Sequence, residues 1–204
     1  MKIDDTDLYP VITPELCKLP PLLVLEAVLK GGAKAVQLRE KNDPLKYARA
    51  FRDLTDKYGA LLIINDFIDV ALACGADGVH IGQEDGDVAG LREKAPGLIL
   101  GVSAEDLDQA LLAQNAGADY IGYGPIFPTE TKKDIKDIKG IEGIKGIAGS
   151  LNIPLVAIGG INKGNIKDVA RAGTKHIAMI TAITQTDDPE KETQELIDLI
   201  RLTH

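Results

Sequence analysis

The chain has 204 residues, of which 45% are apolar, so it can bury one sizeable hydrophobic core. It carries 23 basic and 31 acidic residues, a formal net charge of −8, which argues against nucleic acid and anionic membranes as partners. An anionic ligand would therefore need a local cluster of basic side chains.

The chain shows no sign of export or of membrane insertion. Its first residues are acidic where a secretory signal is basic, and no apolar run reaches the ~20 residues that cross a bilayer. The two cysteines, Cys17 and Cys74, form neither a C-x-x-C motif nor a metal-binding spacing. We therefore expect a cytoplasmic protein with one domain over residues 1–204, in which Cys74 is a buried apolar filler.

Eight short apolar runs follow one another along the chain and predict strands that are covered on both faces. They cover residues 8–12, 35–38, 61–64, 78–81, 98–102, 120–123, 155–158 and 176–180. Helical patterns fill the gaps, and the last helix is expected to begin near Asp188-Pro189, where an acidic cap precedes proline.

A glycine phrase recurs before four of these runs, at Gly32, Gly75, Gly117 and Gly173. Glycine just past a helix end supplies the left-handed conformation of a C-cap. The recurrence indicates βα units of roughly 20 residues. Eight such units, with no G-x-G-x-x-G after the first strand, favour a single (β/α)8 TIM barrel over an open doubly wound sheet.

Two carboxylates follow neighbouring strands of this predicted barrel, Asp66 after the third and Asp85 after the fourth. Active sites of such barrels lie where the strands end. Mg²⁺ takes one or two carboxylates and completes its shell with water and substrate phosphates. The pair therefore predicts a Mg²⁺ site for a phosphorylated small molecule, although both residues could instead be turn acids that face water.

Basic and glycine residues at the same strand ends could meet the phosphate groups. Arg39, Lys41 and Lys132 follow the second and sixth strands, and Gly159-Gly160 after the seventh would let backbone N–H groups approach an anion. Each signal is weak alone, because a Gly-Gly pair is often only a turn and Arg39 could form a surface pair with its neighbour.

Two further features of the rim, a histidine and a charged segment, each allow two interpretations. There is no Ser-His-Asp or Cys-His pair, and His80, within a strand, is more typical of a histidine satisfied in the core than of a catalytic base. The charged segment 128–140 could be a solvated linker or a loop that closes over ligands.

Six motifs stand in order along the chain: residues 37–41 (QLREK), 64–66 (IND), 78–85 (GVHIGQED), 101–103 (GVS), 122–133 (GYGPIFPTETKK) and 157–161 (AIGGI). They run from the second to the seventh strand and span most of the chain. Together they resemble the thiamine-phosphate synthase family. The resemblance implies a transferase that joins a hydroxymethylpyrimidine pyrophosphate to a thiazole phosphate through a Mg²⁺-assisted dissociative reaction.

The resemblance also implies a role for each matching residue. The pyrimidine pyrophosphate and the thiazole phosphate would be bound by Gln37, Leu38, Arg39, Glu40, Lys41, Asn65, Ser103, Thr129, Glu130, Thr131, Lys132, Gly160, Ile180 and Thr181. Lys132, Arg39, Lys41 and Ser103 would serve in catalysis, with Lys132 on the leaving pyrophosphate. Asp66 and Asp85 would bind Mg²⁺.

Two positions depart from the family pattern. Phe67 stands where a polar residue is common, and Thr181 stands where serine is usual, so the fit of the thiazole site is in question. Two alternatives to the synthase are a thiazole tautomerase-like barrel and a non-catalytic barrel that binds phosphate ligands. Small-molecule substrates are the expected partners, without nucleic acid or membrane, and a homo-oligomer is possible.

Overall fold

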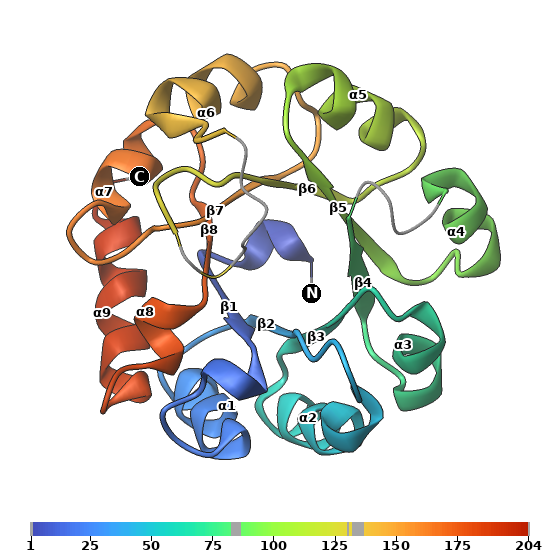
Figure 1. The fold of residues 1–204 in the computed structure, drawn as a ribbon, viewed down its shortest axis with the longest axis vertical. Helices are drawn as coiled ribbons and strands as arrows, with labels where there is room; N and C mark the ends of the chain where they lie inside the picture. The colour runs from blue at the N-terminus through green and yellow to red at the C-terminus, as the bar shows by residue number, and fades with distance from the viewer. Residues whose placement is uncertain (1, 83–86, 130, 132–136, 204) are drawn as a thin grey trace.

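The chain forms a closed barrel of eight parallel strands that pair in sequence order. The computed structural model describes residues 2–82, 87–129, 131 and 137–203. Figure 1 looks along the barrel, with the strands at the centre and the helices in a ring around them. The strands are β1 (Leu8–Ile12), β2 (Ala35–Leu38), β3 (Leu61–Asn65), β4 (Gly78–Ile81), β5 (Ile99–Ala104), β6 (Tyr120–Tyr123), β7 (Leu155–Ile158) and β8 (His176–Met179). The predicted (β/α)8 TIM barrel is confirmed.

The helices cover the outside of the strands. They are α1 (Pro21–Lys30), α2 (Leu45–Tyr58), α3 (Ile68–Cys74), α4 (Val88–Lys94), α5 (Leu107–Asn115), α6 (Gly140–Ala148), α7 (Ile166–Arg171), α8 (Thr181–Thr184) and α9 (Pro189–Arg201), with short 3-10 turns η1 (Ile3–Asp5) and η2 (Pro14–Leu16). Asp188 caps α9 by accepting a hydrogen bond from the backbone N–H of Lys191, as the sequence predicted. No helix built from the described residues is long and apolar enough to span a bilayer.

The glycines of the recurring phrase have the backbone conformation expected of them. Gly32, Gly75, Gly117 and Gly173 all have positive φ, between 70° and 124°. An L side chain is strained in this region, so glycine allows each helix to end and the chain to turn directly into the next strand.

Three strands differ from the predicted runs, and each difference moves a site residue. β3 includes Asn65, which is paired with His80, and β5 extends through Ser103, which is paired with Gly122. β8 ends one residue earlier than expected, at Met179. A search for apolar runs ends at the first polar side chain, whereas the backbone ladder continues. Asn65 and Ser103 therefore lie within the barrel wall rather than beyond it.

The strands separate two apolar layers. Inside the barrel lie Ile3, Tyr9, Val11, Ala35, Leu61, Ile63, Tyr120, Val156 and Ala178. Between barrel and helices lies a larger cluster that includes Leu8, Ile12, Leu62, Ile64 and Ile121, together with Cys74, which is buried as expected. The alternation of Leu8 and Tyr9, or of Tyr120 and Ile121, follows the two-residue period of a strand. Every second strand residue therefore points into the barrel.

Candidate active site

The end of β2 carries two cations at the rim formed by the carboxyl ends of the strands. Arg39 is half-buried and Lys41 is exposed. Within the part of the chain that the structure describes, neither side chain has a carboxylate within ion-pair distance. Glu40 is engaged differently, because its Oε1 accepts a hydrogen bond from the backbone N–H of Asn42 at 2.8 Å. The possible Arg39–Glu40 surface pair is therefore not formed, and both cations remain available to an anion.

Asp66 sits in a strained conformation directly after β3. Its φ of 65° makes it the one non-glycine residue with positive φ among those described. Its backbone N–H donates to the carbonyl of His80 at 2.8 Å, and the next N–H, of Phe67, donates to the carbonyl of Asn65 at 2.8 Å. These bonds hold the half-buried Asp66 at the junction of β3 and β4. Its predicted partner Asp85 lies outside the described residues.

Ser103 and His80 face each other across neighbouring strands. His80 Nε2 is 3.0 Å from Ser103 Oγ, and His80 Nδ1 is 3.0 Å from the hydroxyl of Tyr120. Both ring nitrogens are thus hydrogen-bonded, as expected for a satisfied histidine, but the residue is in direct contact with a candidate substrate ligand. The sequence did not indicate that contact.

Gln37 is linked to two buried tyrosines that the sequence analysis did not select. Gln37 Nε2 donates to the hydroxyl of Tyr9 at 3.1 Å, and that hydroxyl is 3.1 Å from the hydroxyl of Tyr120. Burial raises the pKa of both tyrosines above the usual range, so both hydroxyls keep their protons. The only sign in the sequence that these tyrosines face the barrel interior is that each alternates with outward-facing apolar residues in its strand.

The segments after β6 and β7 pack against each other. Backbone N–H groups of Ile126 and Phe127 donate to the carbonyls of Ile158 and Gly159, each at 3.0 Å. A side chain at Gly160, whose φ is 64°, would lie 2.5 Å from the carbonyl oxygen of Pro128. Gly160 is therefore held directly beside the residue that precedes Thr129.

Four site residues lie near this contact or at the end of β8. The backbone N–H of Thr131 donates to Thr129 Oγ1 at 3.3 Å. Ile180 precedes α8, and its carbonyl accepts the N–H of Thr184 at 2.9 Å, while Thr181 is exposed. Glu130 and Lys132 lie outside the described residues, as does most of the charged stretch 130–136. The base of that stretch is fixed, because the N–H groups of Lys139 and Gly140 donate to the carbonyls at 125 and 126.

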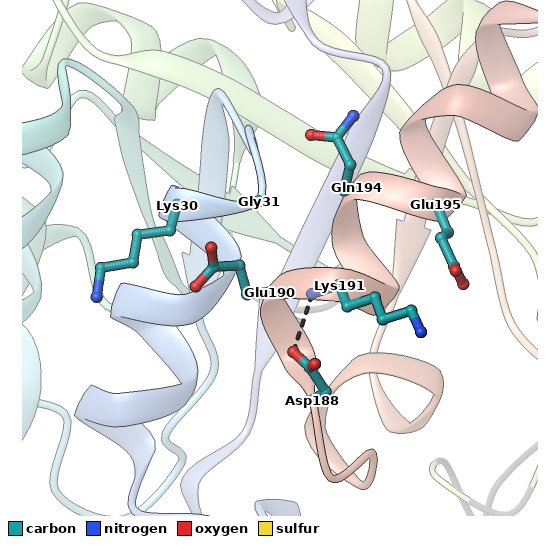
Figure 2. Close-up of a pocket in the computed structure, with 7 residues that line it drawn as sticks. All are labelled: Lys30, Gly31, Asp188, Glu190, Lys191, Gln194 and Glu195. Atoms are coloured by element: carbon teal, nitrogen blue, oxygen red, sulfur yellow. Dashed lines mark hydrogen bonds between the residues drawn. The ribbon is translucent and has the colours of Figure 1, made fainter.

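A separate hollow of about 490 Å³ lies on the outer wall, between α1 and α9 (Figure 2). The drawn charged side chains point in different directions instead of converging on one point, and Asp188 is occupied as the cap of α9. The rim, where the candidate ligands collect, is the better site on chemical grounds.

Known proteins resemble this chain over most of its length. Residues 8–183 match a family model described as thiamine monophosphate synthase. The chain belongs to this family. Members of the thiamine monophosphate synthase family are transferases, and the function of the chain is thiamine-phosphate synthesis from small-molecule substrates.

Named relatives cover most of the chain. The thiamine-phosphate synthase of Chloroflexus aurantiacus is 46% identical over 184 residues, which are 88% of this chain and 85% of the relative. That of Pyrococcus horikoshii is 44% identical over 194 residues, 93% of each chain. A solved thiamine phosphate pyrophosphorylase from Pyrococcus furiosus superposes with a TM-score of 0.90 at 40% identity, covering 98% of both chains.

A more distant structure shows the fold alone. A 3-hexulose-6-phosphate synthase has a TM-score of 0.71 at 17% identity, covering 95% of this chain. One barrel hosts many reactions, so the residues at the rim, and not the barrel itself, distinguish the synthase.

Proposed function

We propose that the rim formed by the carboxyl ends of the strands condenses 4-amino-2-methyl-5-hydroxymethylpyrimidine pyrophosphate with thiazole phosphate, releasing pyrophosphate. The observation that carries this proposal is the pair of cations at the end of β2, Arg39 and Lys41, which form no ion pair within the described residues. Asp66 follows the neighbouring strand β3 with a left-handed backbone conformation. In a chain with a net charge of −8, such cations mark a place for a strongly anionic group.

The pyrophosphate would lie against the end of β2. Arg39 and Lys41 would bind its oxygens, with the hydroxyl of Ser103 and the ammonium group of Lys132 completing the cluster. Fixed cations and donors stabilise charge that develops on a leaving group, and they need no rearrangement as the bond breaks. These side chains therefore act mainly on bond cleavage.

The pyrimidine ring would occupy the mouth of the barrel interior, above the tyrosines. Gln37 and Asn65, from the neighbouring strands β2 and β3, present amide groups there, and both side chains are buried. Leu38, in the same motif, is fully buried between barrel and helices, which favours support of Gln37 and Arg39 rather than contact with substrate. Glu40, hydrogen-bonded within its own turn, would act in the same supporting way.

The thiazole phosphate would bind where the segments after β6, β7 and β8 meet. Gly160 lies against Pro128, so its backbone and the hydroxyls of Thr129 and Thr131 belong to one surface. Ile180 and Thr181 would supply backbone N–H groups from the start of α8, where N–H groups have no partner within the helix. Thr181 keeps the hydroxyl of the more usual serine. Glu130 would border the same phosphate site.

Asp66 and Asp85 would hold Mg²⁺. The carboxylate of Asp66 is a hard oxygen ligand of the kind Mg²⁺ prefers, and its conformation is fixed by the backbone bond to His80. The ion would supply positive charge to neutralise the leaving pyrophosphate.

The reaction needs no acid–base pair in the protein. The bond between the pyrimidine methylene carbon and pyrophosphate oxygen breaks, its electrons leave with pyrophosphate, and the thiazole nitrogen lone pair captures the resulting pyrimidine cation. Because that nitrogen carries no proton, the protein has none to remove. The residues of the rim bind, orient and exclude water.

Pyrophosphate release measured with both substrates, with and without Mg²⁺, tests the proposal. We expect one pyrophosphate for each thiamine monophosphate formed, and no turnover in excess chelator. Rearrangement of the thiazole without condensation would instead indicate a tautomerase. Binding of both phosphates without turnover would indicate a non-catalytic barrel.

A further inference from the structure

A continuous chain of hydrogen bonds crosses the barrel interior from β2 to β5. Gln37 Nε2 donates to Tyr9, Tyr9 meets Tyr120 at 3.1 Å, Tyr120 meets His80 Nδ1 at 3.0 Å, and His80 Nε2 meets Ser103 Oγ at 3.0 Å. The two ends of the chain, Gln37 and Ser103, are the candidate ligands of the pyrimidine and of its pyrophosphate. The three residues between them have no place in the mechanism so far.

Two glycines make room for the rings that form this series of hydrogen bonds. Gly101 lies between His80 and Tyr120 in the strand ladder, and a Cβ there would overlap the ring of Tyr120. A Cβ at Gly122 would lie 2.8 Å from His80 Cε1. Glycine weakens a strand interior, and there it marks a close approach of another group. The wall of the barrel is therefore shaped around these two rings.

All hydrogen bonds of this series point the same way, each donor lying on the Gln37 side and each acceptor on the Ser103 side. The Tyr9 hydroxyl accepts a hydrogen bond from Gln37 Nε2, and Tyr120 is its only other described partner, so Tyr9 donates to Tyr120. Tyr120 in turn donates to His80 Nδ1. A neutral imidazole with an acceptor at Nδ1 carries its hydrogen on Nε2, so His80 donates to Ser103 Oγ.

This direction sets what each end offers. The amide of Gln37 is held with Nε2 toward Tyr9, which leaves Oε1 as an acceptor. Within the described residues Oε1 has no protein partner and is not fully buried, so solvent reaches it. At the other end Ser103 Oγ accepts a hydrogen bond from His80, so the Ser103 hydroxyl donates its own hydrogen bond to an acceptor other than His80.

We propose that Tyr9, Tyr120 and His80 are positioning residues that fix Gln37 as an acceptor and Ser103 as a donor. The inference rests on the proposed function, in which Gln37 would accept from the pyrimidine amino group and Ser103 would donate to a pyrophosphate oxygen. The two ends are coupled. If the Gln37 amide turned round, Tyr9 would donate to it, every bond would reverse, and Ser103 would donate to His80 and not to the substrate.

The tautomer of His80 reports this direction without any measurement of activity. ¹⁵N spectra of histidine-labelled protein distinguish a protonated ring nitrogen from an unprotonated one, and the His80 signals are identified by their loss in His80→Gln. We expect Nε2 of His80 to carry the hydrogen and Nδ1 to lack it. A hydrogen on Nδ1 would overturn the proposal, and this result is readable even if condensation is not observed.

Tyr120→Phe breaks the series of hydrogen bonds but keeps the aromatic ring. Tyr123→Phe is its matched control on the same strand. Tyr123 faces the helices and takes no part in this series of hydrogen bonds. We expect Tyr120→Phe to lower kcat/KM for the pyrimidine pyrophosphate about tenfold, the effect of about one hydrogen bond, with KM for the thiazole phosphate unchanged. Tyr123→Phe should leave both unchanged.

A merely structural role would raise the KM of both substrates alike. An equal rise of both KM values in Tyr120→Phe, or an unchanged kcat/KM for the pyrimidine pyrophosphate, would therefore overturn the proposal. Absence of condensation in the unsubstituted protein would instead count against the proposed function.

Discussion

Asp77 and Asp119 make equivalent contacts at the amino ends of β4 and β6. Asp77 Oδ2 accepts from Arg52 Nη1 at 2.6 Å and from a backbone N–H of β3 at 2.8 Å. Asp119 Oδ2 accepts from Arg92 Nη2 and from a backbone N–H of β5 at 2.8 Å. Two of the four recurring glycine phrases thus carry an aspartate that ties its strand to the neighbouring strand and to a helix, on the side of the barrel opposite the candidate site.

Replacement of these aspartates should destabilise the barrel unequally. The Arg52 side chain is 9% exposed and that of Arg92 is 26% exposed. Asp77→Ala leaves a buried guanidinium whose one remaining ionic partner among the described residues is the exposed Asp56, so we expect a loss of about 3 kcal/mol in the free energy of unfolding. Asp119→Ala should lose less. Urea unfolding measures both, and a larger loss at Asp119 would contradict this account.

Asp66→Asn should abolish Mg²⁺-dependent turnover while preserving the fold. Asparagine tolerates the left-handed conformation of Asp66, so the substitution removes charge without adding strain. We expect kcat to fall about a hundredfold or more, with an unchanged melting temperature. Asp66→Gly, which also accepts this conformation, is the control for lost side-chain contacts. Near-normal activity of both variants at low Mg²⁺ would exclude a metal-binding role.

Lys132→Ala should lower kcat and kcat/KM together, because the ammonium group is proposed to act on the departing pyrophosphate. Loss of one such charged donor costs about 3 kcal/mol, or about a hundredfold in rate. Lys145, an exposed residue paired with Glu142 on α6, provides the control, and Lys145→Ala should leave both constants unchanged. A rise in KM alone would assign Lys132 to ground-state binding.

Shortening the loop within residues 135–137, with residues 129–133 kept intact, should expose the pyrimidine cation to water. The hydrogen bonds from Lys139 and Gly140 to residues 125 and 126 would hold the base of the loop in place. If the loop closes over the substrates, the ratio of pyrimidine alcohol to thiamine monophosphate should rise even where pyrophosphate is still released. An unchanged product ratio, with equal amide exchange in the presence and absence of both substrates, would make the segment a linker.

His176 should make the fold less stable in mild acid. Burial lowers its pKa, as does Lys175, while the bond from Nδ1 to the Thr6 carbonyl and the nearby Asp4 and Asp7 raise it. Below the unfolded pKa of about 6.5, the unfolded chain binds a proton that the folded protein does not, so stability falls as the pH decreases.

The matched variant for this prediction is His176→Asn, which can keep the bond to Thr6 but does not titrate. The difference in free energy of unfolding between pH 7.5 and pH 5.5 should be larger in the unsubstituted protein. Equal differences in the two proteins would show that His176 contributes nothing to the pH dependence.

The sequence predicts the barrel well because buried parallel strands are continuous apolar runs separated by helical patterns, and a glycine end signal precedes four of these runs. It predicts the ends of β3 and β5 less well, because Asn65 and Ser103 continue the ladder with polar side chains. The roles of Asp85, Glu130 and Lys132 remain predictions, since these residues lie outside the described ranges.

The chain of bonds from Gln37 to Ser103 could not be predicted from one sequence. It depends on the register of the strands, which places His80, Gly101 and Tyr120 side by side across three of them. Within its own strand each of these residues resembles an ordinary buried position. Only the pairing shows that the glycine leaves space and that the tyrosine fills it.

Gly101 and Tyr120 therefore share a single volume, and neither can change much in size alone. A larger residue at 101 collides with the ring, and a smaller residue at 120 leaves a void in the centre of the barrel. A substitution that is damaging at one position should be tolerated when the other compensates, so the effects of the two on stability should be strongly non-additive. Sequence drift at these two positions is then expected only in concert, and variants of the barrel that enlarge its interior must pass through paired changes.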